Sequence, residues 1–359
     1  MFTYWVVFLF VGMLAMIGRS RLPVSVNSPQ KIDIDILWAC IIVFLTIFIG
    51  LRFEVGGDWR AYLMYYDSFS GIDLKEAFII TSDPGYILIN WASNRMDWGI
   101  YAVNTICGFI FSLGLAIFCR NLPRPMLALL AAIPYLLIVV GMGYSRQGVA
   151  LGFAMMAFVA LGREKKFLFV FLILLATSFH KTAIVMLPIA ALAATKNRFW
   201  LIIWIGSLGL LSYLTVFAAS FDRLYLYYVE NSYQSEGALI RLLMLLLPSI
   251  LILLWPHRFT FTRPELSLWR VCAIISIGLF VLLFISDAST AVDRIALYML
   301  PIQLVVFSYL PEIFGQKGEL RQWILIAIII YFGMVLQVWS MLSDYSVFWK
   351  PYQNILLKL

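Results

Sequence analysis

The stretch Gly50-Leu51-Arg52-Phe53-Glu54-Val55-Gly56-Gly57-Asp58-Trp59-Arg60 lies where a long apolar run gives way to the longest charged loop of the chain. It holds two arginines and two acidic residues beside a Gly-Gly pair. Charged side chains are costly at a membrane unless they pair or bind something, and an apolar helix can end with far less than this. We therefore interpret the stretch as the rim of a site for an anionic, membrane-borne substrate.

The composition around this stretch indicates an integral membrane protein. The 359 residues are 63% hydrophobic and 13% charged, whereas soluble domains are about 45–50% apolar and about 25% charged. The apolar runs recur from end to end, which is typical of a helical bundle and not of a barrel with alternating strands. The fold class expected is an all-α, polytopic helical bundle, with residues 1–359 forming a single membrane domain.

The apolar runs predict about ten spans, which we place at 2–18, 35–51, 98–119, 125–142, 146–162, 199–218, 239–255, 268–286, 292–310 and 322–341. No basic residue precedes the first span, while Arg19, Arg21 and Lys31 follow it, so the positive-inside rule puts the N-terminus outside. On this topology the inner side holds 15 of the 26 Lys and Arg residues and 6 of the 19 acidic residues. The net charge is then +9 inside and −2 outside, which agrees with the total of +7.

Three outer segments follow from this topology: the main loop at about 52–97, a second loop at 219–238, and an exposed tail at 342–359. In the main loop Asp58 is a plausible helix N-cap. Trp59, Tyr62, Tyr65, Tyr66 and Phe69 follow at helical spacing, which predicts a helix with one aromatic face lying on the membrane.

Segment 167–194 does not fit a simple span. It lies between Lys165-Lys166 and Lys196-Asn197-Arg198, two basic clusters that both look cytoplasmic. Two full crossings would need about 40 residues, more than the segment has. We predict a broken or re-entrant hairpin with Phe179-His180-Lys181 at its tip, since non-helical backbone at this depth must be buried in protein or line a wet cavity.

Arginine dominates the basic residues of the outer side, and most of these arginines stand at the outer end of a span: Arg52, Arg60, Arg95, Arg146, Arg223, Arg241 and Arg294. The planar guanidinium binds phosphate oxygens through two parallel donors and stays charged at any working pH. The alternative is that these side chains anchor helix ends or form ion pairs, for example Arg294 with Asp293 or Asp287.

His180 and Asp58 are the candidate bases. Histidine accepts a proton near neutral pH, and the ammonium of Lys181 would keep the imidazole of His180 neutral. The outer acidic residues are interleaved with arginines and form no metal-ligand pattern, so we expect neither a metal nor another cofactor. The four cysteines (Cys40, Cys107, Cys119 and Cys272) all lie inside apolar runs at wide spacings, which excludes a disulfide scaffold and a cysteine-based zinc site. No basic run indicates nucleic-acid binding.

Six short motifs occur in order along residues 50–352: Gly50-Leu51-Arg52 with Val55-Gly56-Gly57-Asp58-Trp59 and Tyr62; Asp83-Pro84-Gly85-Tyr86-Ile87-Leu88-Ile89-Asn90; Ser145-Arg146-Gln147-Gly148-Val149-Ala150; Ser178-Phe179-His180-Lys181-Thr182-Ala183; Asp293-Arg294-Ile295-Ala296-Leu297-Tyr298; and Lys350-Pro351-Tyr352. With these motifs the chain resembles the Wzy-type polymerases of the EpsG-like group, which build bacterial O-antigen, capsule and exopolysaccharide chains. Gly57 departs from the pattern, because many relatives have a small hydroxyl residue there.

The resemblance implies a GT-C-like membrane fold and a glycosyltransferase that polymerises repeat units at the outer (periplasmic) face of the bacterial cytoplasmic membrane. Donor and acceptor glycans would both be linked to undecaprenyl diphosphate, and a protein that regulates chain length is a further candidate partner. Carried onto this chain, the resemblance implies diphosphate binding by Arg52, Arg146 and Arg294, with Arg146 also catalytic. His180 would act as the base, with Asp58 as orienting or basic partner. Candidate sugar contacts are Trp59, Tyr62, Glu54 and Tyr352.

Three other functions use similar parts. A flippase for lipid-linked sugars would also need arginines for the diphosphate, but would need no base. An O-antigen ligase shares the parts of a polymerase and is separated from it only by the resemblance. An O-acyltransferase would use an intramembrane histidine but would not require so many outer arginines.

Overall fold

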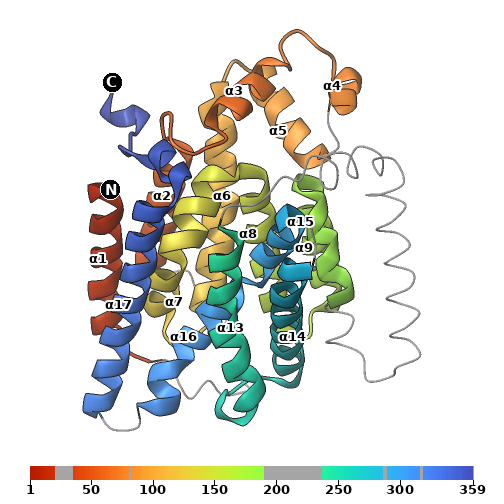
Figure 1. Ribbon diagram of the computed structural model, residues 1–359. Coiled ribbons are helices and arrows are strands. Elements are labelled where there is room, and N and C mark those ends of the chain that lie inside the picture. Colours follow the sequence, from red (N-terminus) through yellow and green to blue (C-terminus); the bar gives the residue numbers. More distant parts are fainter. Residues whose placement is uncertain (21–34, 81–82, 190–236, 286–288, 316–317, 359) are drawn as a thin grey trace, which may run out of the picture.

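The computed structural model describes residues 1–20, 35–80, 83–189, 237–285, 289–315 and 318–358. Within these ranges the chain is helical, apart from loops and one isolated β-bridge between Arg52 and Asn354. The long helices run side by side in a bundle, and three short helices lie across one end of it (Figure 1). Both chain termini lie toward that same end.

Helices are found at nine of the ten predicted spans: α1 (Phe2–Ile17), α2 (Ile36–Gly50), α6 (Gly99–Arg120), α7 (Pro125–Ala132) with η1 (Ile133–Gly141), α8 (Ser145–Gly162), α13 (Ala238–Leu254), α14 (Arg263–Ile285), α15 (Ser289–Ala296) with η6 (Leu297–Met299) and α16 (Pro301–Phe314), and α17 (Gly318–Leu342). The other helical segments are α3 (Trp59–Asp67), α4 (Leu74–Ile80), α5 (Pro84–Arg95), α9 (Lys166–Phe179), η2 (Lys181–Val185), η5 (Pro256–Arg258), η7 (Asp344–Trp349) and η8 (Ile355–Leu357). The predicted span 199–218 lies outside the described residues, and so does almost all of the predicted loop 219–238.

The chain is a multi-pass helical membrane protein. In the part that the structure describes, α6, α8, α14 and α17 are each long and apolar enough to cross a membrane, and the bent pair α15–α16 adds a fifth candidate span. Five further apolar helices have 10–17 residues: α1, α2, the α7–η1 pair, α9 and α13. The total of ten spans stays a prediction.

Two predicted spans are not the straight α-helices that the hydrophobic pattern suggested. The span at 292–310 is broken into two parts bent by 42°, with the break at Pro301, which has no N–H to continue the helix. The span at 125–142 changes from α-helix to π-helix at Ile133. π-Turns widen a helix and occur often at functional sites.

The outer loop and the tail are also packed differently from the prediction. The aromatic face of α3 lies against protein and not on the membrane: Tyr62 and Tyr65 pack on the ring of Tyr86 in α5, with centroids 5.9 and 5.4 Å apart. The C-terminal tail is exposed along much of its length, as predicted, but it is also fixed to the rest of the protein through buried residues such as Trp349 and Asn354. Two backbone hydrogen bonds join it to the start of the outer loop: Phe53 N–H donates to the Gln353 carbonyl, and Ile355 N–H donates to the Leu51 carbonyl.

Helices α6 and α8 approach each other very closely at the centre of the bundle. A Cβ added at Gly114 would lie only 2.2 Å from the backbone oxygen of Gly152. Small residues permit such backbone contact between membrane helices. This packing holds the N-terminal end of α8, which carries Arg146, beneath the outer loop.

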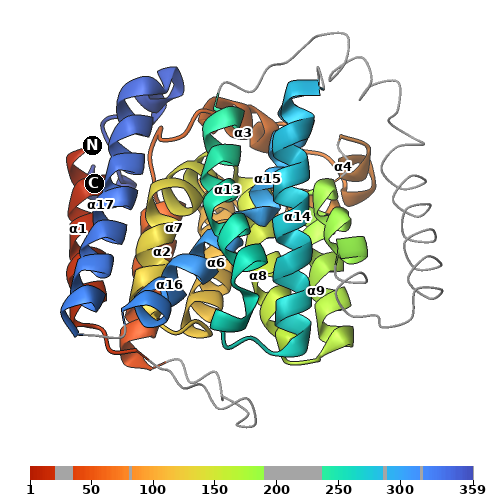
Figure 2. The same ribbon diagram turned by 60° about the horizontal axis from the view of Figure 1, so that its bottom comes forward.

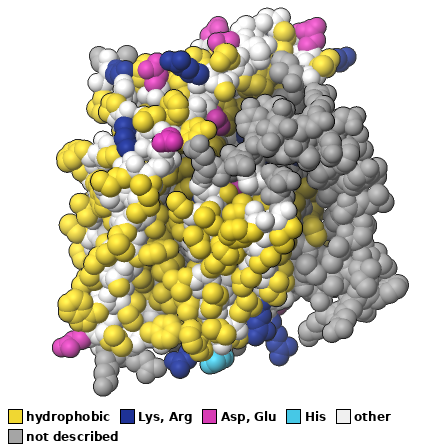
Figure 3. Space-filling model, viewed as in Figure 1, with side chains coloured by type: hydrophobic (Ala, Val, Ile, Leu, Met, Phe, Trp, Pro, Cys, Tyr) yellow, Lys and Arg dark blue, Asp and Glu magenta, His cyan; other side chains and the backbone are white. Residues whose placement is uncertain are grey.

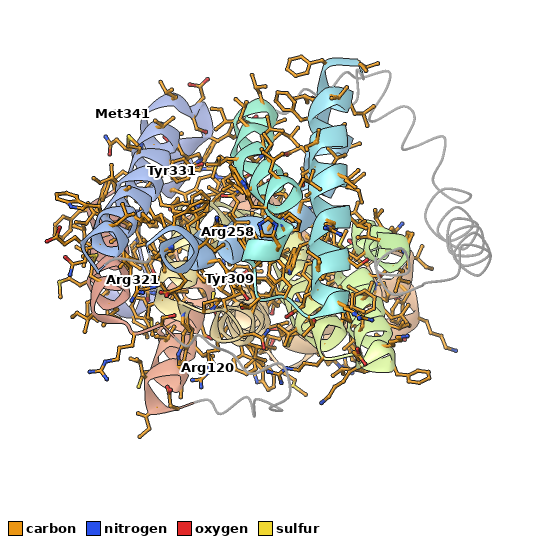
Figure 4. The ribbon with its side chains drawn as sticks, turned by 90° about the horizontal axis from the view of Figure 1, so that it is seen from below. Arg120, Arg258, Tyr309, Arg321, Tyr331 and Met341 are labelled. Atoms are coloured by element: carbon orange, nitrogen blue, oxygen red, sulfur yellow. The ribbon has the colours of Figure 1, made fainter. Side chains whose placement is uncertain are left out.

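A hydrophobic surface covers the middle of the molecule in the view of Figure 3, and the charged side chains on that face gather toward its two ends. The end opposite α3–α5 is seen in Figure 4, where Arg120, Arg258 and Arg321 are labelled. Among the described residues, three ion pairs lie at this end: Arg124 with Glu312 at 2.8 Å, Arg321 with the same Glu312 at 3.6 Å, and Arg120 with Asp35 at 3.0 Å. Arg120, Arg258 and Arg321, which come from three different loops predicted to be cytoplasmic, therefore lie at the same end of the bundle. The direction in which the bundle is inserted into the membrane stays a prediction.

Candidate functional site

The opening stretch of the loop wraps around the side chain of Arg52, which is only 1% exposed. Its guanidinium donates to the carbonyl of Ile49 at 2.6 Å and to that of Val55 at 3.1 Å. It also donates to the hydroxyl of Ser145 at 2.9 Å, the residue before Arg146. Arg52 therefore fixes the turn after α2 against the start of α8.

Gly56 brings the next part of the loop against the junction between η1 and α8. Its φ of 107° suits glycine, and a Cβ there would lie 2.7 Å from the carbonyl oxygen of Met142. The Gly56 N–H donates to the carbonyl of Phe348 in the tail at 2.9 Å. Asp58 follows as the N-cap residue of α3, but its carboxylate makes no capping hydrogen bond.

Trp349 of the tail fills the space behind this loop. Its indole N–H donates to the carbonyl of Ile138 in the π-helix at 2.8 Å. A Cβ added at Gly143 would be 2.6 Å from its ring, so the ring lies directly on the backbone before α8. The tail thus ties together the loop, the π-helix and the start of α8.

These elements enclose a cavity of about 730 Å³. Its polar wall comes from α3 and its N-cap, α8, the break after α9, α13 and α15, and consists of Asp58, Tyr62, Tyr144, Arg146, Gln147, His180, Arg241, Thr290, Asp293 and Arg294. Its apolar wall comes mainly from α13 and α17. A chamber of this size with a few converging polar groups is typical of a ligand site.

Arg146 is the arginine that Asp83 positions. Its guanidinium pairs with the Asp83 carboxylate at 2.9 Å and lies over the ring of Tyr86, 5.9 Å from the centroid. The Arg146 side chain is nevertheless 39% exposed, so it can reach a ligand in the cavity. Gly85 allows α5 to lie against the end of α9, because a Cβ there would be 2.7 Å from the Ser178 hydroxyl.

The opposite wall holds a second cationic group that the sequence-based site did not include. Arg241 of α13 forms an ion pair with the buried Asp293 of α15 and lies over the Tyr135 ring of the π-helix. Arg294, the residue after Asp293, lines the same cavity, and its carbonyl accepts a hydrogen bond from the Gln147 side chain at 3.0 Å. Asp293, one of the two acidic residues that the sequence offered as a partner of Arg294, thus forms an ion pair with Arg241.

His180 follows the last residue of α9 in an extended conformation, which breaks the helix at the cavity wall. The predicted break at Phe179-His180-Lys181 is thus present, although the returning arm lies largely outside the described residues. His180 Nδ1 is 2.6 Å from the Thr182 hydroxyl, which in turn is 3.4 Å from the hydroxyl of Tyr298. If Thr182 donates to Tyr298, it accepts from Nδ1–H, and Nε2 is then the unprotonated nitrogen.

The cavity moves the pKa values of its two candidate bases in opposite directions. Burial, followed by the charges of Arg294 and Arg146, lowers the pKa of His180 from 6.5 to about 3. Asp58 is exposed at the cavity; partial desolvation by the surrounding protein raises the pKa of its carboxyl group above 3.8, and the same two arginines partly oppose this. Asp58 is therefore a stronger base than an ordinary aspartate, and His180 is a neutral imidazole at working pH.

The structure brings five of the sequence-predicted site residues to one cavity: Asp58, Tyr62, Arg146, His180 and Arg294. The other four do not line it. Arg52 is buried beneath the loop, Trp59 packs on Arg52 and Tyr101, Glu54 is exposed on the loop, and Tyr352 stacks on Phe48 with its hydroxyl bonded to the Phe48 carbonyl. Arg241 could have been included from its place at the outer end of a span, whereas nothing in the sequence marks Tyr135 or Trp349.

Comparison with known proteins gives one family. The sequence model of the EpsG family matches residues 35–354. No curated protein and no solved structure matches the chain.

Proposed function

Because the chain belongs to the EpsG family, which is associated with exopolysaccharide biosynthesis, we propose that it is a polymerase of oligosaccharide repeat units linked to undecaprenyl diphosphate. The proposal is supported by the cavity, in which Arg146 and Arg294 meet the two candidate bases, Asp58 and His180, while a third arginine, Arg241, lines the far wall. A lipid-linked glycan polymerase needs cations for a diphosphate leaving group and a base for a sugar hydroxyl. A flippase would need only the cations.

In the proposed reaction, a hydroxyl oxygen of the acceptor sugar attacks the anomeric carbon of the donor sugar. The bond between that carbon and the diphosphate oxygen breaks, and undecaprenyl diphosphate leaves with the electron pair. Arg146 and Arg294 take the negative charge that develops on the leaving oxygen, in a cavity where such stabilisation is stronger than in water. Arg241 supports this field from the far wall but is already paired with Asp293.

The proton of the acceptor hydroxyl goes to Asp58. Its carboxylate is exposed at the cavity, where an acceptor sugar can reach it, and its pKa is raised whereas that of His180 is lowered. We therefore assign the proton to Asp58, which reverses the order expected from the sequence. Binding of a diphosphate to Arg146 and Arg294 offsets the charges that oppose protonation of both groups, so it strengthens both as bases. His180, held by Thr182, orients the acceptor hydroxyl as a neutral hydrogen-bonding group.

Arg52 has no direct part in this proposal, because its donors are taken up by Ile49, Val55 and Ser145. It acts by holding the loop that carries Asp58 against the start of α8. Tyr62 is the one of the four candidate sugar contacts that lines the cavity, so we keep it as a contact to the glycan.

Reconstitution tests the proposal. Purified protein in detergent with EDTA is mixed with a synthetic undecaprenyl-diphosphate repeat unit, and the products are separated on a gel. We expect a ladder from the wild type and from Arg60→Ala, an exposed arginine outside the cavity, but none from Arg146→Ala or Asp58→Asn. A ladder of normal length from Arg146→Ala would contradict the assignment of the site.

A further inference from the structure

The cavity has a second, apolar half that the reaction above does not use. On α17 it is lined by Tyr331, Met334, Val335, Val338 and Leu342, and on α13 by Ile240, Leu243 and Met244. We call this half the slot. Both helices pack against α16, and in Figures 1 and 2 they stand on either side of it.

The slot extends deep into the bundle. Tyr331 and Leu342 both line the cavity, and eleven residues of helix at 1.5 Å each correspond to about 16 Å. That is roughly half of a hydrocarbon core of about 30 Å. A sugar or a free diphosphate would leave this depth unfilled, whereas an extended hydrocarbon chain would follow it.

The slot is continuous with the half of the cavity that holds the arginines, and side chains that line it are also exposed on the surface of the bundle. Leu243 is 47% exposed, Met334 55% and Val338 40%, although all three line the cavity. Along α13 the exposed apolar face continues from Ile240 and Leu243 to Leu247 and Ile250, at the 3–4 residue spacing of one helix face. A groove with arginines at one end and apolar side chains along the rest matches an amphiphile with an anionic head.

We propose that the slot between α13 and α17 binds the polyprenyl chain of a lipid diphosphate, which enters sideways from the bilayer with its diphosphate directed at Arg294 and Arg146. The inference rests on the proposed function for the identity of the lipid, and it adds where the tail lies and by which route it enters. The bilayer's own phospholipid is the competing occupant, and the test separates the two.

Binding of labelled undecaprenyl diphosphate to the full chain in nanodiscs tests the slot without any glycan. Val338→Trp fills the slot, and Met341→Trp is the matched control on the same helix, since Met341 is 72% exposed and does not line the cavity (Figure 4 labels Met341 and Tyr331). We expect Val338→Trp to weaken binding by about tenfold or more, equivalent to ~1.4 kcal/mol. Met341→Trp should bind as the wild type does, and inorganic diphosphate should bind both variants equally.

A probe with a photoreactive group in its polyprenyl tail gives a readout that does not depend on a variant. We expect cross-links to peptides 238–254 and 331–342 of the wild type that undecaprenyl diphosphate competes away and phospholipid does not. Three results would contradict binding of the polyprenyl chain in the slot: unchanged affinity in Val338→Trp, competition by phospholipid, or cross-links spread equally over the exposed face of α14. If the polyprenyl chain binds normally but no ladder forms in the polymerisation assay, the proposal of a polymerase is rejected, whereas the proposal of a lipid-binding slot is kept.

Discussion

The guanidinium of Arg52 donates to the carbonyls of Ile49 and Val55, whereas that of Arg146 faces the cavity and pairs with Asp83. Two arginines that look alike in the sequence therefore have different tasks. The first holds a turn together from inside, and the second is exposed enough to meet a ligand.

The lysine variants separate these tasks. Arg52→Lys would leave buried carbonyls without a donor, at about 1–3 kcal/mol for each unsatisfied group, so we expect a lower melting temperature in detergent. Arg146→Lys keeps the charge but loses the planar fork, so we expect a normal melting temperature and a rate about 10²–10³-fold lower. Equal loss of stability in both variants would contradict the division of roles.

The pH dependence of the reaction distinguishes the two bases. As the pH falls from neutral, activity should decline when Asp58 takes up a proton, at a pH above the ordinary carboxyl value of 3.8 because its pKa is raised. His180 has a pKa lowered to about 3 and is neutral throughout that decline. His180→Gln should therefore reduce the rate without moving the acid limb of the kcat/KM profile. An acid limb near 6.5 that vanishes in His180→Gln would make His180 the base.

The helices predicted from the hydrophobic pattern agree best with the structure where the whole helix is a regular, apolar α-helix. Predicted spans 35–51 and 98–119 coincide with α2 and α6 within a residue or two. The π-helix at Ile133–Gly141 and the bend at Pro301 were missed, because apolar periodicity reports burial and not the hydrogen-bond register of the backbone. The face of α3 was misassigned because its aromatic spacing fits packing against α5 as well as it fits lipid.

Candidate site residues were predictable where a charged or titratable side chain lies at the end of an apolar helix. Arg146, Arg294, His180 and Asp58 are charged or titratable groups at helix ends, which is an unusual place for them in an apolar chain. Arg52 has the same signature, and only the carbonyls around it show that it is structural. Trp349 has no such signature, since aromatic residues are common throughout the chain.

The tail can be tested through its anchor. Trp349→Phe removes the hydrogen bond to the Ile138 carbonyl and leaves that buried acceptor unsatisfied, at about 1–3 kcal/mol. We expect a lower melting temperature together with reduced glycan transfer, because the π-helix and the loop before Asp58 both lose their contact. Trp323→Phe, at a side chain that is 67% exposed on α17, is the control and should change neither. Normal transfer by Trp349→Phe would show that the tail does not shape the site.

The cavity lies toward the end of the molecule formed by α3, α4 and α5, and the basic loops gather at the other end. The positive-inside rule predicts that the cavity end faces outward. This is the side on which a repeat unit would be available after its lipid carrier has been moved across the membrane.

Cysteine accessibility tests this orientation. In a Cys40→Ala background, since Cys40 is the exposed cysteine and Cys107, Cys119 and Cys272 are buried, Lys75→Cys and Arg258→Cys place thiols at exposed positions of the two ends. We expect an impermeant maleimide to label Lys75→Cys on intact cells and Arg258→Cys only after permeabilisation. The reverse pattern would place the cavity on the cytoplasmic side.

If this cavity forms glycosidic bonds as we propose, undecaprenyl diphosphate leaves each time a bond is made. The most direct measurement counts the undecaprenyl diphosphate released and the glycosidic bonds formed by purified protein acting on a lipid-linked repeat unit, for the wild type and for Arg294→Ala. We expect one lipid diphosphate to be released for every bond formed by the wild type, and both products to be lost together in Arg294→Ala. Movement of the intact lipid across liposomes by the wild type, with no bond formed and no lipid diphosphate released, would contradict this proposal.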